Sequence, residues 1–86
     1  MELVIKKNFK SEEGKDTELF YKLLQEDGFG VEITSKTSEE TESSKALSIS
    51  QNEVEAVKII SMLADNLVTP VTMKDILYDY SYQKLY

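Results

Sequence analysis

The sequence contains no cysteine, no histidine and no arginine among its 86 residues. Without cysteine there are no disulfides and no thiolate metal sites, and without histidine the commonest metal ligand and acid–base group near neutral pH is missing. A glycine-rich phosphate loop and a Gly-x-Ser-x-Gly nucleophile elbow are absent as well. These absences argue against an enzyme, and we expect no cofactor and no bound metal ion.

The charge balance is acidic, with 16 aspartate and glutamate residues against 10 lysines and a net charge of −6. Arginine has the planar fork that binds phosphates and guanine edges through two hydrogen bonds, whereas lysine is a point charge. Because nucleic-acid binding depends on neutralising phosphates, we expect no nucleic-acid partner. Mimicry of nucleic acid by the acidic surface is the less favoured interpretation, since moderate negative charge usually serves solubility.

Long apolar runs are also missing. No segment approaches the roughly 20 apolar residues of a membrane-spanning helix, and the first residues lack the apolar stretch and cleavage site of a signal peptide. We therefore expect a cytoplasmic protein without a membrane partner. Residues 1–86 should form a single domain, and because a small core without disulfides or metal often gains stability by self-association, we expect a homodimer.

The first half of the sequence predicts β-strands. Residues 2–9 place Leu3, Ile5 and Phe9 on one face, which is typical of a half-buried strand. The polar segment that follows contains Gly14 and predicts a turn.

Two further strands are predicted on either side of Asp27-Gly28, which is a hairpin signal. Residues 17–25 are apolar on both faces, so their periodicity alone fits a strand or a short helix. The hairpin favours a strand, and either of its faces could be inward. Residues 29–36 alternate clearly, and Gly30 within them indicates a bulge or the close approach of another backbone.

Residues 37–44 are all threonine, serine or glutamate, with no large apolar residue. A mobile polar loop is therefore expected there. The acidic Ser/Thr-rich composition suggests a kinase target or a weak cation site, but a solvated loop is the favoured interpretation. Residues 45–49 are expected to return as a short fourth strand.

A first helix is predicted over residues 51–66. Ser50 and Glu53 have the spacing of a capping box, with Ile49 expected to pack on Val54 as a hydrophobic staple. Asn66 is expected to end the helix in the left-handed conformation. The helix should bury one apolar stripe that consists of Ala56, Val57, Ile60, Leu63 and Ala64.

A second helix is predicted over residues 72–83. Thr72 and Asp75 repeat the capping spacing, and Val71 would be the staple residue. A competing start places the cap at Thr69 with Pro70 as the first helical residue. The core stripe of this helix consists of Met73, Ile76, Leu77 and Tyr80.

These elements predict an α+β fold, an antiparallel meander of three or four strands with two C-terminal helices packed on one face. The strands are expected to contribute Leu3, Ile5, Phe9, Leu19, Tyr21, Leu23, Phe29, Val31 and Ile33 to the core. The helices are expected to contribute Val57, Ile60, Leu63, Ile76, Leu77 and Tyr80.

The sequence resembles a family of small uncharacterised bacterial proteins, found mainly in anaerobic Gram-positive bacteria. The resemblance runs from Thr17 to Tyr80 and rests on Phe29-Gly30-Val31-Glu32-Ile33, Asn66-Leu67-Val68-Thr69-Pro70-Val71 and Asp75-Ile76-Leu77. Family members often carry Ser-Pro in place of Thr69-Pro70 and a histidine in place of Thr72. The family has no assigned activity, so the resemblance supports the fold and implies no chemistry.

The second helix has more aromatic surface than a core requires. Tyr78 and Tyr82, with Leu85, would form a strip more than about a hundred degrees from the core stripe, and tyrosine is enriched at protein interfaces. Packing of these rings within the same molecule is an equally weighted alternative. We expect a protein-interaction or regulatory module that binds another protein or itself through this helix or a free strand edge.

Two other functions are compatible with the sequence. The alternative to an interaction module is a small-molecule binding domain with a pocket between sheet and helices, near Gly30. The least favoured is a carboxylate-dependent enzyme using Asp75 and Asp79, which share one helix face at the spacing of any solvated helix.

Overall fold

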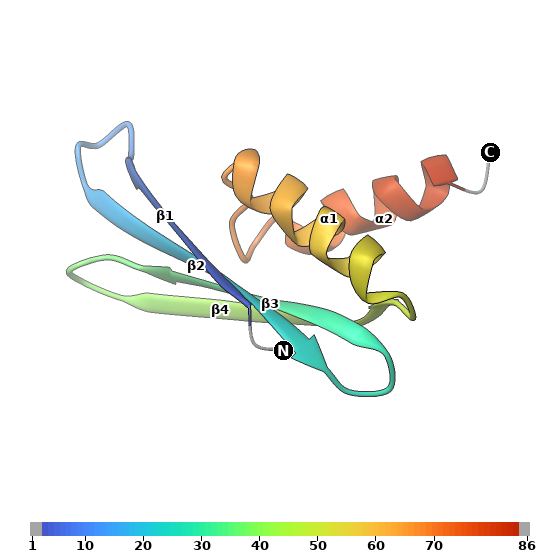
Figure 1. Ribbon diagram of the computed structural model, residues 1–86. Helices are drawn as coiled ribbons and strands as arrows, with labels where there is room; N and C mark the ends of the chain where they lie inside the picture. Colours follow the sequence, from blue (N-terminus) through green and yellow to red (C-terminus); the bar gives the residue numbers. More distant parts are fainter. Residues whose placement is uncertain (1–2, 85–86) are drawn as a thin grey trace.

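Four antiparallel strands followed by two helices confirm the expected α+β meander (Figure 1). The computed structural model describes residues 3–84, and the side chains of residues 3–79. The strands are β1 (Val4–Lys10), β2 (Asp16–Gln25), β3 (Phe29–Lys36) and β4 (Thr41–Ser50), and the helices are α1 (Glu53–Asp65) and α2 (Met73–Lys84). The sheet order is β1-β2-β3-β4, and both helices lie on one face of the sheet.

The central position of β2 explains why it is apolar on both faces. Leu19, Tyr21 and Leu23 are buried under the helices, whereas Phe20 and Leu24 are half-buried on the opposite face. Ile59 and Val68 also belong to the core, although the sequence stripe did not include them, and Val57 is only half-buried. The buried apolar residues are Leu19, Tyr21, Leu23, Val31, Ile33, Ala56, Ile59, Ile60, Leu63, Ala64, Val68 and Met73.

The expected mobile loop over residues 37–44 is wrong for its second half, because β4 already begins at Thr41. Its polar residues pair through their backbones with β3, so they need no apolar side chains to become ordered. The connection between β3 and β4 is therefore a tight turn of residues 37–40, which hydrogen bonds of Thr37 stabilise. Its hydroxyl accepts hydrogen bonds from the Glu39 and Glu40 amides at 3.3 and 3.1 Å.

The close backbone approach indicated by Gly30 is confirmed. A Cβ atom on Gly30 would lie 2.5 Å from the Ala46 carbonyl oxygen and 3.1 Å from the Leu47 Cα. The register between β3 and β4 shifts next to this contact, and Ser48 has a left-handed backbone with φ of 55°. The end of β4 is therefore bent, as is usual beside a β-bulge.

The predicted cap of the first helix is wrong by two residues. Asn52 caps α1, with its Oδ1 accepting a hydrogen bond from the Glu55 amide at 3.1 Å. The Ser50 hydroxyl instead accepts from the Asn52 amide at 3.0 Å. Serine and asparagine are both good caps, and the later start leaves Val54 65% exposed, so it is not a staple.

The end of α1 also differs from the prediction. Asn66 has φ of −97°, and Leu67 is the left-handed residue with φ of 51°. The Leu67 amide donates to Ala64 O at 3.1 Å and the Val68 amide to Leu63 O at 3.0 Å, which is the Schellman pattern. This places Val68 in the core.

Helix α2 begins directly after Thr72, as the preferred capping signal predicted. The Thr72 hydroxyl, however, lies 3.1 Å from the Thr69 hydroxyl, and the Thr69 carbonyl accepts hydrogen bonds from the amides of Thr72 and Met73. Val71 lies within this turn and is 76% exposed, so the second staple is wrong as well. The turn carries the chain from the buried Val68 to α2.

Candidate functional site

A buried tyrosine fixes the place where α2 leaves the core. The Tyr21 hydroxyl of β2 donates a hydrogen bond to the Val68 carbonyl at 2.9 Å, and both residues are buried. Burial raises the pKa of Tyr21 to about 12. The bond joins the centre of the sheet to the segment between the helices, so it determines how α2 lies over β4.

Helix α2 is attached by few of its side chains. Met73 is fully buried, and Ile76 and Leu77 are half-buried against the core. Tyr78 is 71% exposed. Since little of the described part of α2 is covered, one side of this helix remains free to contact a ligand or partner.

Two hollows follow one another along β4, on the side where the helices lie. The first, of about 370 Å³, is lined by residues 46–49 of β4, Ile59 of α1, and Lys74, Leu77 and Tyr78 of α2. The second, of about 490 Å³, lies between residues 42–44 of β4 and the turn residues Pro70 and Val71. We call the two hollows together the β4–α2 trough.

The first hollow of the β4–α2 trough is mainly apolar, whereas the second is lined largely by polar residues, including Glu42, Ser43 and Ser44. Ile49, Ile59 and Leu77 form apolar walls, and Leu47 and Tyr78 expose large apolar surfaces beside them. Lys74 supplies a positive charge. The apolar walls of the first hollow are suited to binding apolar side chains.

The sequence placed only part of this site. Tyr78 lies at the trough, whereas the side chain of Tyr82 and the whole of Leu85 lie outside the described residues. Residues 42–44 were expected to lie in a loop and not in β4, whereas residues 46–49 belong to the expected strand over residues 45–49. A detectable signal was the spacing of Val71, Lys74 and Tyr78, which places them on one face of a helix and its preceding turn.

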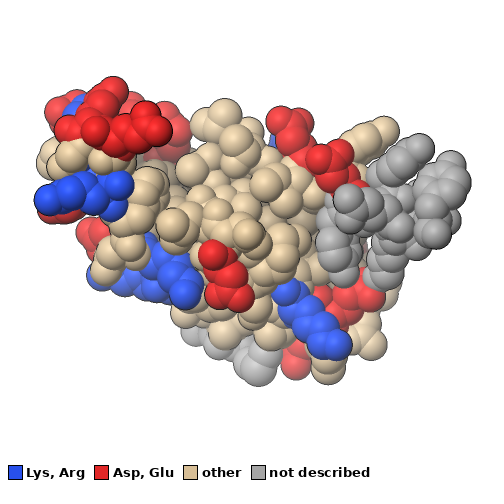
Figure 2. Space-filling view, turned by 90° about the horizontal axis from the view of Figure 1, so that it is seen from above, with Lys and Arg blue, Asp and Glu red and all other residues tan. Residues whose placement is uncertain are grey.

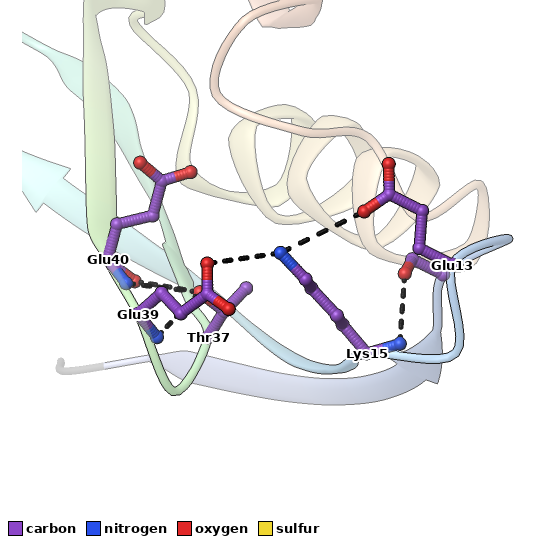
Figure 3. A network of polar contacts seen from close by, with 6 residues as sticks. Glu13, Lys15, Thr37, Glu39 and Glu40 are labelled. Atoms are coloured by element: carbon purple, nitrogen blue, oxygen red, sulfur yellow. Dashed lines mark hydrogen bonds and ion pairs between the residues drawn. The ribbon is translucent and has the colours of Figure 1, made fainter.

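Acidic residues gather at one end of the sheet, where the β1–β2 and β3–β4 turns lie (Figure 2). Lys15, in the β1–β2 turn, contacts Glu39 in the β3–β4 turn at 3.1 Å and Glu13 at 3.8 Å (Figure 3). These groups are exposed, so the pairs hold the tips together only weakly. Within residues 3–79, no group of three or more metal-binding side chains was found, here or near Asp75 and Asp79.

The fold and the trough define a small α+β protein with an unpaired sheet edge beside an apolar hollow. The chain belongs to the Family of unknown function (DUF6514), whose model matches residues 1–83. No curated protein and no solved structure matches the chain. Among the described helices, none is long and apolar enough to cross a membrane.

Proposed function

We propose that the protein is a cytoplasmic protein-interaction module that acts by binding, without catalysis. Its site is the β4–α2 trough together with the free edge of β4. The observation that carries the proposal is the position of exposed apolar side chains, Leu47, Val71 and Tyr78, along a strand edge that lacks a neighbour in the described sheet.

The two sheet edges differ in their protection against strand addition. β1 carries Lys6, Lys7 and Lys10 within its seven residues. β4 carries Lys45 as its one lysine in ten residues, among serine and threonine side chains. Lysine on an edge strand opposes the addition of another strand, so β4 is the more accessible edge.

An extended segment of a partner protein fits this arrangement. Its backbone would pair with the edge of β4, and its alternate side chains would point to the helix side of the sheet. Apolar side chains at those alternate positions would enter the two hollows of the trough. We therefore propose an extended segment with apolar residues at every second position as the occupant.

The test compares two valines whose side chains are similarly exposed but lie in different parts of the structure. Val71 lines the trough and is 76% exposed, whereas Val54 at the start of α1 is 65% exposed and outside it. Peptides selected from a displayed random library on the wild-type protein should show alternating apolar residues. Their affinity should fall about tenfold for Val71→Asp and Tyr78→Ala, because a charge or a void replaces buried apolar contact.

The control variant Val54→Asp should bind the selected peptides as the wild type does. Equal loss with Val54→Asp and Val71→Asp, or peptides without apolar alternation, would reject the trough as the site. Sedimentation of the three variants tests the expected homodimer separately. If a second copy is the partner, the wild type sediments as a dimer and Val71→Asp as a monomer.

A second candidate function is small-molecule binding in the first hollow. Its volume of about 370 Å³ is within the range of ligand pockets, and its apolar walls adjoin Lys74. Gly30 lies behind it, against Ala46. An amphipathic carboxylate such as octanoate should then raise Tm for the wild type but not for Lys74→Ala; an unchanged wild-type Tm across a carboxylate series would reject this function.

A further inference from the structure

The face of the sheet opposite the helices carries a charge of the other sign from the rest of the chain. Because side chains alternate along a strand, the residues between the buried ones point away from the helices, and we call this surface the open face. Its charged residues are Lys6, Lys10, Asp16, Glu18, Lys22, Glu32, Lys36 and Lys45.

Charge is strongly divided between this face and the remainder. Five of the 10 lysines but only three of the 16 acidic residues lie on the open face. The open face therefore carries a net charge of +2, and the rest of the sequence carries −8. A positive surface on a protein of net charge −6 favours acidic groups, because the rest of the sequence is net negative.

Phe20 lies at the centre of this positive surface. It pairs across the sheet with Lys6 and Thr34, and the ammonium groups of Lys6 and Lys36 lie 5.8 and 5.5 Å from its ring centroid. Phe20 and Leu24 are half-buried, so part of each apolar side chain remains accessible. The centre of the face thus combines an apolar anchor with positive charges on two sides.

The internal ion pairs do not use all the positive charge. Lys6 and Glu18 are 2.9 Å apart, Lys45 and Glu32 are 4.0 Å apart, and Lys6 holds the pKa of Glu18 below its usual range. Lys22 forms no ion pair with any described side chain. Lys22 and Lys36 are therefore the lysines most available to an incoming carboxylate.

We propose that the open face binds an acidic segment of a partner protein, with an apolar residue of that segment on Phe20 and Leu24 and its carboxylates on Lys22 and Lys36. Separate carboxylates avoid Glu18 and Glu32, which would repel the continuous phosphate chain of a nucleic acid. The site lies on the opposite side of the sheet from the β4–α2 trough, and the two meet only at the strand edge, where Leu47 lines hollows on both sides.

The test is a charge reversal with a matched control. The probe is a synthetic octapeptide, Glu-Glu-Phe-Glu-Glu-Phe-Glu-Glu, which lacks the alternate apolar residues proposed to enter the trough. The readout is its affinity and the wild-type amide chemical shifts. Lys22→Glu/Lys36→Glu should weaken binding about tenfold, since two surface ion pairs are lost. Lys7→Glu/Lys58→Glu changes the net charge equally but lies off the open face, because Lys7 is on the helix side of β1 and Lys58 is in α1, and it should leave the affinity within about twofold.

The chemical-shift changes expected on binding lie in β2 and β3, around Phe20. Phe20→Ala should weaken binding by a factor that does not change with salt concentration, whereas the weakening caused by the lysine substitutions should shrink as salt is added. Equal weakening by both double variants would show that only overall charge matters and would overturn the proposal. Shifts confined to β4 and α2, or tighter binding of a single-stranded oligonucleotide than of the peptide, would also overturn it.

Discussion

Removing one oxygen atom from Tyr21 should loosen the attachment of α2. Tyr21→Phe keeps the buried ring but deletes the 2.9 Å hydrogen bond to the Val68 carbonyl. A buried acceptor left without its partner costs about 1–3 kcal/mol, and because the lost bond joins two neutral groups we expect about 1–2 kcal/mol. In urea denaturation the midpoint should fall while the slope m stays unchanged.

The control is Tyr78→Phe, which removes the hydroxyl of a 71% exposed ring and should change the unfolding free energy by less than about 0.5 kcal/mol. Hydrogen exchange should also quicken in α2 of Tyr21→Phe more than in the sheet. Equal stability of the two variants would refute the idea that this bond holds the segment between the helices.

The same hydroxyl predicts how stability depends on pH. Burial raises the pKa of Tyr21 to about 12 from the ordinary value of 10.0 for tyrosine. Between these values the unfolded chain has lost the proton that the folded chain keeps. The free energy of unfolding should therefore fall as pH rises, by up to about 1.4 kcal/mol per unit from this group. Tyr21→Phe should lack this contribution, and identical slopes for both proteins would contradict it.

Three further substitutions test the backbone features. Gly30→Ala should lower the free energy of unfolding by about 1–3 kcal/mol in urea denaturation, because its Cβ would lie 2.5 Å from the Ala46 oxygen; no loss would contradict the close approach. Leu67→Gly should raise the unfolding free energy by about 0.5–1 kcal/mol, since φ of 51° strains leucine, and a decrease would show that its side-chain packing outweighs the strain. Asn52→Ala should cost about 1 kcal/mol, more than Glu53→Ala, and the reverse order would favour the Ser50–Glu53 capping box.

The structural features that could be predicted from the sequence are those that neighbouring residues determine. Asp27-Gly28 lies in the β2–β3 turn, where both residues have positive φ, and Gly30 marks the contact with β4. The apolar alternation of β3 and the stripe of α1 predicted most of the core. Each of these depends on neighbours in the chain or on a conformation that few residues adopt.

Features that depend on contacts between residues far apart in the chain could not be predicted from the sequence. Residues 41–44 are polar and belong to β4 because β3 offers a backbone ladder, which the local composition does not reveal. Ser50 and Asn52 are both good capping residues, and the local sequence does not reveal that the chain bends at Ser48, where the hydroxyl donates to Asp27 O at 3.1 Å, or that Asn52 is the cap. The β4–α2 trough could not be placed for the same reason, since it is formed by segments that meet only in the fold.

Hydrogen exchange at the edge of β4 tests the central claim most directly. The amides of residues 41–50 that face away from β3 should exchange rapidly in the unbound protein, because that edge has no neighbour in the described sheet. Binding of a selected apolar-alternating peptide should slow exchange at alternate positions of β4 and leave β1 unchanged. Unchanged exchange in β4 under saturating peptide would contradict strand addition at this edge.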